Sequence, residues 1–297
     1  MNWITDRHVL ITGGNAGIGR ATARQLAALG AHVTIACRDA TRAALAQRDI
    51  EASTGTAVNV VELDLASLAH IRQAAATIRA ALQPIDVLVN NAGVAVLGRR
   101  RRETADGFER QIGVNHLGHA LLTSLLSDRI TERVVNVSSA GYAMARHGLD
   151  FDDLQWNRRE YDGWAAYGAS KLANLYFTWE LADRLADRHV TVNALHPGFV
   201  DTELGYRRPE EGGKPKPAQL ETSGTIGNID LGALGTPLSA DEGARTSVAV
   251  ASDPLLSDTT GAYFDDHQHQ ISDLGSVALD RSASERLWRV SLELVGL

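Results

Sequence analysis

The sequence predicts a single α/β domain, built as one doubly wound parallel sheet of the Rossmann type with helices on both faces. Three observations predict it. Short apolar runs of strand length alternate with longer helical stretches. A glycine-rich turn joins the first apolar run to the first helix. No shift in composition and no internal repeat divides residues 1–297, and a chain of this length can bury about three quarters of its unfolded surface.

Six apolar runs are predicted to be the strands of the sheet. They cover residues 8–11, 32–37, 57–62, 86–90, 133–137 and 190–195. Stretches between them predict helices at 21–29, 40–52, 68–82, 106–127 and 164–188. Parallel neighbours in a sheet require such crossover helices, so the alternation itself indicates a parallel sheet.

Two serine-containing sequences predict the starts of the last two helices. Ser239 with Glu242, and Ser282 with Glu285, have the spacing of a capping box, in which both side chains satisfy backbone N–H groups. The last helix, 282–297, is amphipathic. We expect it to pack on its own domain or against a second copy of the chain in a homo-oligomer.

Composition favours a small-molecule role. The formal net charge of −7 argues against a nucleic-acid or anionic-membrane partner, and no apolar run approaches transmembrane length. Cys37 is the one cysteine, so no intramolecular disulfide can form. Because the first residues also lack the pattern of a signal peptide, we expect a cytoplasmic protein.

The glycine turn at residues 12–19 predicts a pyrophosphate-binding site. Glycine lets an anion approach the backbone, and the N–H groups and positive dipole end of the following helix face it. The residues expected to bind are Gly13, Asn15, Gly17, Ile18 and Gly19. The alternative is a tight strand-to-helix turn without a ligand.

The residues after the second and third strands indicate which nucleotide binds. Arg38, with help from Arg42, is placed to hold a 2′-phosphate, which favours NADP(H). The neighbouring Asp39 leaves open an NAD-type contact with the ribose. Asp64 and Leu65 are expected at the adenine, with a helix N-cap as the alternative role of Asp64.

A tyrosine and a lysine four residues apart predict acid–base chemistry. Tyr167 and Lys171 project from one face of a helix, and an ammonium beside a phenol lowers the phenol pKa. Tyr167 is therefore expected to exchange a proton with a substrate oxygen. Ser139, at the end of the fifth strand, is placed to donate a hydrogen bond to the same oxygen.

Five motifs in order resemble the short-chain dehydrogenase/reductase family of the classical type over residues 6–265. They are Thr12-Gly13-x-x-x-Gly17-x-Gly19, Asn90-Asn91-Ala92-Gly93, Ser138-Ser139, Tyr167-x-x-x-Lys171 and His196-Pro197-Gly198. Further segments, such as 115–119, are similar to the branch of retinol dehydrogenases, WW-domain oxidoreductases and protochlorophyllide reductases. That resemblance implies NADPH and a lipophilic substrate.

The resemblance also implies roles for individual residues. Lys171 would hold the nicotinamide ribose, and Asn115 a water that links Lys171 to solvent. Family positions at the adenosine ribose match Asn91, Ala92 and Gly93, and those near the nicotinamide carboxamide match Pro197, Gly198, Val200 and Thr202.

Two departures from the common pattern concern specificity. The long gap between Ser139 and Tyr167 contains an insert whose aromatic residues either wall an apolar pocket or pack over the sheet edge; they include Phe151, Trp156, Tyr161 and Trp164. Residues 203–236 are expected to be a substrate lid, with a disordered insertion as the alternative. The arginine run 99–102 is read as a solvated loop, with attraction of an anionic substrate or partner as the alternative. His267 and His269 lack a third ligand nearby, so we expect no metal site.

Together these features predict an NADP(H)-dependent oxidoreductase that acts on the carbonyl or alcohol of an apolar small molecule. Retinoid-, steroid- and polyketide-like compounds all stay open, and a soluble ketoreductase of secondary metabolism is the favoured form. The alternative from another class is a non-catalytic NADPH-binding sensor or scaffold, since a cofactor fold alone does not guarantee turnover.

Overall fold

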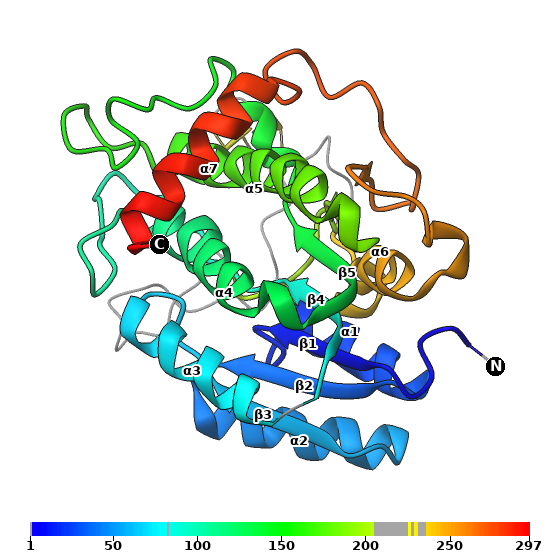
Figure 1. Cartoon of the computed structure of the whole chain (residues 1–297). Coiled ribbons are helices and arrows are strands. Elements are labelled where there is room, and N and C mark those ends of the chain that lie inside the picture. Colours follow the sequence, from blue (N-terminus) through cyan, green and yellow to red (C-terminus); the bar gives the residue numbers. More distant parts are fainter. Residues whose placement is uncertain (1, 82, 205–224, 227–228, 231–235) are drawn as a thin grey trace.

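One seven-stranded parallel sheet forms the centre of the molecule (Figure 1). The computed structural model describes residues 2–81, 83–204, 225–226, 229–230 and 236–297. The strands lie in the order β3-β2-β1-β4-β5-β6-β9. Their bounds are β1 His8–Thr12, β2 His32–Cys37, β3 Val58–Glu62, β4 Ile85–Asn90, β5 Ile130–Val137, β6 Thr191–Leu195 and β9 Tyr263–Phe264. The six predicted strands are confirmed, and β9 is an addition at the edge.

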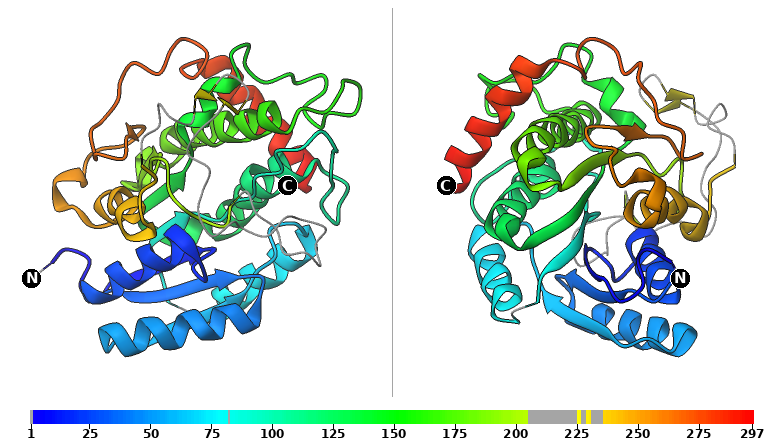
Figure 2. Two further views of the ribbon diagram at one scale, coloured as in Figure 1. Left: turned by 180° about the vertical axis from the view of Figure 1, so that it is seen from behind. Right: turned by 45° about the vertical axis from the view of Figure 1, so that its right-hand side comes forward.

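Helices cover both faces of the sheet, as predicted. The helices α1 (Gly17–Ala28), α2 (Ala40–Thr54) and α6 (Ala240–Ser252) pack on one face. The opposite face carries α3 (Leu68–Ala80), α4 (Gly118–Leu126) and α5 (Gly163–Leu185), with α7 (Arg281–Val295) lying outside α5 (Figure 2). The order of the strands reverses between β1 and β4, which is where a doubly wound sheet opens a binding crevice.

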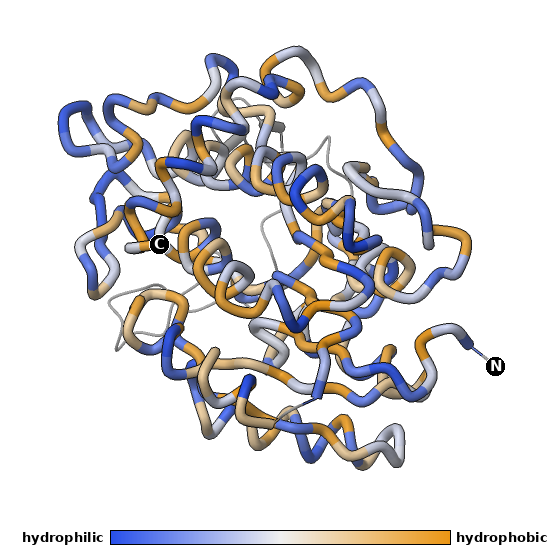
Figure 3. Tube along the Cα trace, viewed as in Figure 1, coloured by the Kyte–Doolittle hydropathy of each residue, from blue (hydrophilic) through white to orange (hydrophobic). Residues whose placement is uncertain are grey.

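Alternation along β1 shows why the sheet needs both helical layers. Val9 and Ile11 pack in the core beside α1 and α2, whereas Leu10 between them packs in the core beside α3 and α4. Successive side chains of a strand point to opposite faces, so a strand that is apolar at every position requires cover on both. Figure 3 shows hydrophobic residues along the central strands, while the outer loops are mostly hydrophilic.

The predicted helix at 106–127 begins later than expected. Gly107 has a φ of +84°, a left-handed conformation that interrupts a helix. The helical backbone begins with Arg110 and Gln111, forms the buried π-helix η1 (Ile112–Leu117) and continues into α4. The Glu109 carboxylate accepts hydrogen bonds from the backbone N–H groups of Gln111 (2.9 Å) and Ile112 (2.8 Å), which fixes this start.

Of the two predicted capping boxes, one is confirmed. Ser239 and Glu242 cap α6 reciprocally. The prediction at Ser282 is wrong, because α7 begins one residue earlier and its N-cap is Asp280, whose carboxylate accepts from the N–H of Ala283 at 3.0 Å. A carboxylate two residues upstream satisfies the helix start, so Ser282 lies inside the helix.

The last helix packs on its own domain, which was one of the two predicted alternatives. The ring of Trp288 stacks on Phe177 of α5 with centroids 5.6 Å apart. Farther along α7, the hydroxyl of Ser291 lies 2.7 Å from Nε2 of the buried His116. In the described ranges, none of the helices is both long and apolar enough to cross a membrane.

The predicted lid, residues 203–236, falls almost entirely outside the described residues. Within it the structure describes residues 203–204 and 236 and two short strands, β7 (Thr225–Ile226) and β8 (Ile229–Asp230), which pair antiparallel. The lid therefore stays a prediction.

Candidate active site

A cavity of about 1030 Å³ opens at the carboxyl ends of the strands, across the point where the strand order reverses. All but one of the predicted site residues line it. These are Gly13, Asn15, Gly17, Ile18, Gly19, Arg38, Asp64, Leu65, Asn91, Ala92, Gly93, Ser139, Tyr167, Lys171, Pro197, Gly198, Val200 and Thr202. The exception is Asn115, which is fully buried behind the cavity wall.

The start of α1 forms an anion cradle in this cavity. Gly17, with a φ of +50°, opens the helix, and the N-cap Ala16 supplies no side-chain hydrogen bond to the first turn. An anion in the cavity would satisfy those N–H groups. Gly19 is required by space, because a Cβ there would lie 2.4 Å from both the Asn91 amide nitrogen and the Gly13 carbonyl oxygen.

Basic side chains after β2 also line the cavity. Arg38 and Arg42 both face it, and the Arg42 guanidinium contacts the Glu203 carboxylate at 2.8 Å. One carboxylate oxygen of Asp39 accepts from the backbone N–H of Arg42 at 2.9 Å and caps α2. This capping role gives Asp39 a reason to be present other than an NAD-type contact.

Asp64 is not the cap of α3, so that alternative is wrong. The N-cap is Ser67, and the Asp64 carboxylate accepts from the N–H of Ala66 at 2.9 Å inside the loop. Asp64 thereby holds a tight turn at the cavity edge. Arg110, which the sequence analysis missed, lines the same cavity. Its only sequence signal is its place just before η1.

Tyr167, Lys171 and Ser139 converge on the cavity wall beyond β5. The Lys171 ammonium lies 5.8 Å from the centre of the Tyr167 ring and donates to the Val137 carbonyl at 3.0 Å. The Ser139 hydroxyl accepts from the N–H of Gly141 at 3.0 Å and hydrogen-bonds the Tyr167 side chain. The predicted grouping of the three side chains is thus present.

The predicted lowering of the Tyr167 pKa is wrong in this structure. Burial raises the pKa of Tyr167, and the hydrogen bond with Ser139 opposes that rise. Burial also lowers the pKa of Lys171, to about 8. Desolvation disfavours the charged form of each group, so the two pKa values move apart and that of Lys171 lies below that of Tyr167. The phenol therefore stays protonated at neutral pH.

Asn115 holds the loop after β4 from the π-helix. Its side-chain amide donates to the Val94 carbonyl (3.0 Å) and to the Ser170 hydroxyl (2.9 Å), and its amide oxygen accepts from the N–H of Val94 (2.8 Å). Its backbone carbonyl faces Nδ1 of the buried His119 at 3.0 Å. The water-holding role implied by resemblance stays a prediction.

Comparisons with known proteins decide the family. The sequence profile described as short chain dehydrogenase matches residues 7–149 and 156–212. Human retinol dehydrogenase 13 is 42% identical over 299 residues, covering 99% of this chain and 86% of that protein. Human retinol dehydrogenase 14 is 39% identical, with 97% and 86% covered. The chain belongs to the short-chain dehydrogenase/reductase family.

Solved structures agree with this family. An uncharacterized protein from Mycobacterium paratuberculosis superposes with a TM-score of 0.76 at 35% identity, covering 100% of this chain and 96% of that one. A short chain dehydrogenase from Burkholderia cenocepacia J2315, solved with NADP, has a TM-score of 0.68 at 27% identity, with 89% and 97% covered. The predicted resemblance to this family and the predicted fold class are confirmed.

In this short-chain dehydrogenase/reductase the aromatic insert packs against the protein. Tyr161 donates to the buried Glu109 carboxylate at 2.7 Å, and the edge of Trp156 meets the Tyr161 ring at 5.7 Å. Phe151 lies under the guanidinium of Arg286. Among the described residues that line the cavity, the four aromatic side chains are absent, which favours the packing alternative.

The arginine run at 99–102 makes contacts with its own chain. Arg99 pairs with the exposed Glu160 at 3.0 Å. Arg101 contacts Glu103 and donates to the backbone carbonyl of Gln155 at 2.7 Å. Such contacts are typical of a surface loop, and none of the four arginines lines the described cavity.

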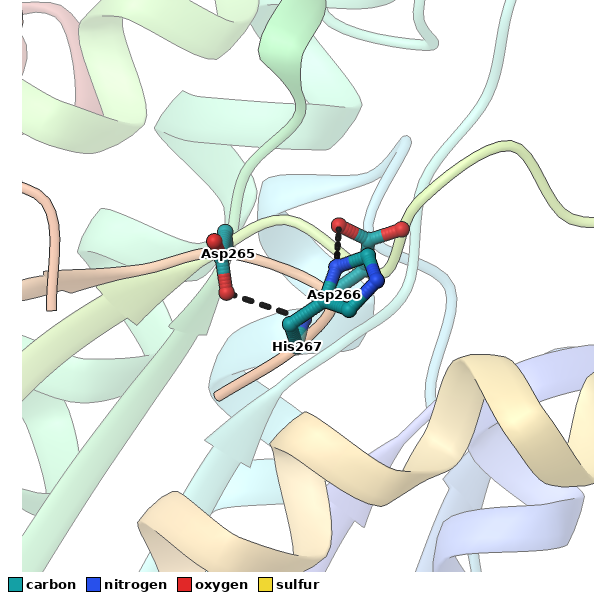
Figure 4. A group of neighbouring side chains, drawn as sticks. All are labelled: Asp265, Asp266 and His267. Atoms are coloured by element: carbon teal, nitrogen blue, oxygen red, sulfur yellow. Dashed lines mark hydrogen bonds and ion pairs between the residues drawn. The ribbon is translucent and has the colours of Figure 1, made fainter. Parts of the chain in front are cut away.

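The prediction that His267 has no further possible metal ligands nearby is wrong. Figure 4 shows Asp265, Asp266 and His267 together after β9, with potential ligand atoms within 4.8 Å of one another. The carboxylates of Asp265 and Asp266, which directly precede His267 in the sequence, are these possible ligands. The Asp265 carboxylate accepts backbone N–H groups of His267 (2.9 Å) and His269 (2.8 Å), so the turn itself explains the cluster. The absence of a metal stays a prediction.

Cys37 lies buried at the end of β2, beside the glycine turn. Burial raises the pKa of its thiol to about 12, against a smaller opposing effect of hydrogen bonds from the backbone of Asn15 and Gly14. A thiol with so high a pKa holds little thiolate at neutral pH, so we expect Cys37 to react slowly with thiol reagents.

Proposed function

We propose that the chain is an NADP(H)-dependent oxidoreductase that interconverts the carbonyl and alcohol of an apolar small molecule. The observation that carries the proposal is the convergence of the Tyr167 phenol, the Ser139 hydroxyl and the Lys171 ammonium on one wall of a cavity whose far end presents Arg38. A proton donor, a hydrogen-bond donor and a cation at one place suit the reduction of a carbonyl.

The cavity fits a nicotinamide dinucleotide phosphate. The uncapped start of α1 offers N–H groups to a pyrophosphate, and the basic residues after β2 suit a 2′-phosphate. Gly93 lies beside the proposed catalytic groups, with the Asn115 amide oxygen and the Lys171 ammonium at 3.4 and 3.7 Å from where a Cβ would stand. When bound, the nicotinamide supplies or accepts the hydride. Solved relatives with NADP or NADPH support this choice.

The residues of the chain move the proton. In reduction, the neutral Tyr167 phenol gives its proton to the substrate oxygen as negative charge develops there. Ser139 accepts from Gly141 with its oxygen, so its O–H points toward the Tyr167 hydroxyl and can turn to donate to a substrate oxygen placed there. The Lys171 ammonium stabilises the phenolate that remains, which favours the proton transfer.

Arg38→Ala is expected to weaken NADPH binding by roughly 1.5 to 3 kcal/mol and to leave NADH binding almost unchanged, since only NADPH carries the 2′-phosphate. Titration of both nucleotides by fluorescence measures the difference. The control is Arg48→Ala, which removes an exposed arginine of α2 that does not line the described cavity. An equal loss for both nucleotides would assign Arg38 a structural role.

The reduction rate is expected to fall at high pH. Lys171 titrates with a pKa of about 8, and its protonated form is the one that stabilises the phenolate. We expect kcat/KM for reduction to be constant below this pH and to decline roughly tenfold per pH unit above it. A profile that stays flat to pH 9.5 in a stable enzyme would contradict this role of Lys171.

Relatives named retinol dehydrogenases support a retinoid-like substrate among the apolar candidates. Steroid- and polyketide-like ketones, the latter in secondary metabolism, are the other candidates. The test is consumption of NADPH and of NADH against retinal, bulky ketones, aldehydes and quinones. Tight NADPH binding without turnover on the whole panel would favour the second candidate function, a cofactor-binding sensor or scaffold.

We also propose a cytoplasmic location, supported by a single buried cysteine and hence no disulfide. A homo-oligomer stays a proposal as well, and light scattering of the purified chain tests it.

A further inference from the structure

A buried chain of hydrogen bonds runs from the glycine turn to the active-site asparagine through His119. The hydroxyl of Thr12, the last residue of β1, accepts the backbone N–H groups of Asn91 (3.0 Å) and Ala92 (2.9 Å). The same oxygen lies 2.8 Å from Nε2 of His119 on α4. On its other side, Nδ1 of His119 lies 3.0 Å from the Asn115 carbonyl oxygen.

The groups at the two ends of this chain of hydrogen bonds, Thr12 and Asn115, determine where each proton lies. A carbonyl oxygen can only accept, so Nδ1 of His119 must carry the hydrogen that points at Asn115. The two lone pairs of the Thr12 hydroxyl are taken by two backbone N–H groups. Its hydrogen is therefore the one left for His119, and Nε2 accepts it; the alternative acceptor, the Val89 carbonyl, lies farther away at 3.5 Å.

The same count of hydrogen-bond donors and acceptors excludes the Nε2–H tautomer of His119. With hydrogen on Nε2, the Thr12 oxygen would face three donors, and the bare Nδ1 would face the lone pairs of the Asn115 carbonyl. The doubly protonated imidazolium would also present a third donor to the Thr12 oxygen, and it would add a buried charge near Lys171. Burial lowers the pKa of His119 to about 4, which keeps the ring neutral at physiological pH.

We propose that His119, as the Nδ1–H tautomer, is a positioning residue that fixes the Asn115 carbonyl and the cofactor-binding turn in one rigid frame. The turn is held through Thr12, which binds Asn91 and Ala92 of the cavity wall. Asn115 is held at its carbonyl by His119, and its side chain binds Ser170, the neighbour of Lys171. The catalytic consequence rests on the proposed function.

The tautomer is tested on the wild-type chain by NMR with ¹⁵N-labelled histidine. The signal of His119 is identified among the ten histidines by its loss in His119→Asn. At pH 7 we expect a protonated-type shift at Nδ1 and an unprotonated-type shift at Nε2. The reverse assignment, or two protonated nitrogens, would overturn the inference.

A matched pair of variants tests the positioning role. Asparagine can keep an N–H donor where Nδ1 stands, whereas His119→Leu removes it. We expect kcat to fall at least tenfold in His119→Leu and to stay within about threefold in His119→Asn, with KM for NADPH raised in both because neither keeps the Nε2 acceptor of the Thr12 hydroxyl. Equal kcat values in the two variants would overturn the positioning role.

The NMR shifts are measured on the wild-type chain, and the measurement does not depend on turnover. If the wild-type chain is inert toward every substrate, the proposed function fails, while the tautomer still stands or falls on its own signal.

Discussion

Replacing Tyr167 by phenylalanine is expected to lower kcat by about a thousandfold while NADPH binding stays within about twofold. The variant keeps the ring that packs against the cavity wall and loses only the hydroxyl that hydrogen-bonds Ser139. General acid catalysis of this kind contributes roughly 10²- to 10⁴-fold to a rate, so its loss dominates every other change. Steady-state kinetics with retinal and NADPH, together with nucleotide titration, measure both quantities.

Tyr176→Phe provides a matched control on the same helix. Tyr176 is buried in α5 and donates to the Val277 carbonyl at 2.6 Å, far from the cavity lining. Its phenylalanine variant loses a buried hydrogen bond of about 1 kcal/mol and should keep kcat. Near-normal turnover in Tyr167→Phe would remove Tyr167 from the role of proton donor.

Mild acid is expected to destabilise the fold by about 3 kcal/mol between pH 6.5 and pH 5. Burial lowers the pKa of His116 to about 3 and of His119 to about 4, from 6.5 in the unfolded chain. The unfolded state therefore binds protons that the folded state refuses, and stability falls as the pH drops below 6.5. Each histidine contributes about 1.5 kcal/mol of this loss, because the imidazole of the unfolded chain is already half protonated at pH 6.5.

Urea unfolding at pH 6.5 and pH 5 measures this loss. Glu109 works in the opposite direction, because burial raises its pKa and the folded state takes up its proton first. The variant His116→Gln should remove about half of the acid effect, whereas His70→Gln, which alters an exposed histidine, should leave it unchanged. Equal pH dependence in the two variants would contradict the buried-histidine explanation.

Much of the fold and the cavity lining could be predicted because both follow from rules local in sequence. A strand that is apolar at every position must lie in a covered sheet, and residues that follow parallel strands meet at one edge. Arg38 after β2, Asn91 after β4 and Ser139 after β5 therefore share one cavity, as expected.

Features that depend on a partner distant in sequence were not predictable in this way. The late start of the helix at Arg110 depends on Glu109, whose carboxylate is held by Tyr161 about fifty residues later. The direction of the Tyr167 pKa depends on how fully the surrounding chain buries the phenol, which the spacing to Lys171 does not reveal. Local spacing shows which groups meet, and tertiary packing decides how they titrate.

The buried thiol of Cys37, with its raised pKa, makes this chain convenient for site-specific labelling. Because the native cysteine has almost no thiolate at neutral pH, a second cysteine at an exposed position would react alone with maleimide dyes. Leu255, which is 86% exposed in the loop after α6, is one such position. A fluorophore there would follow tumbling or assembly of the native chain without any cysteine having to be removed.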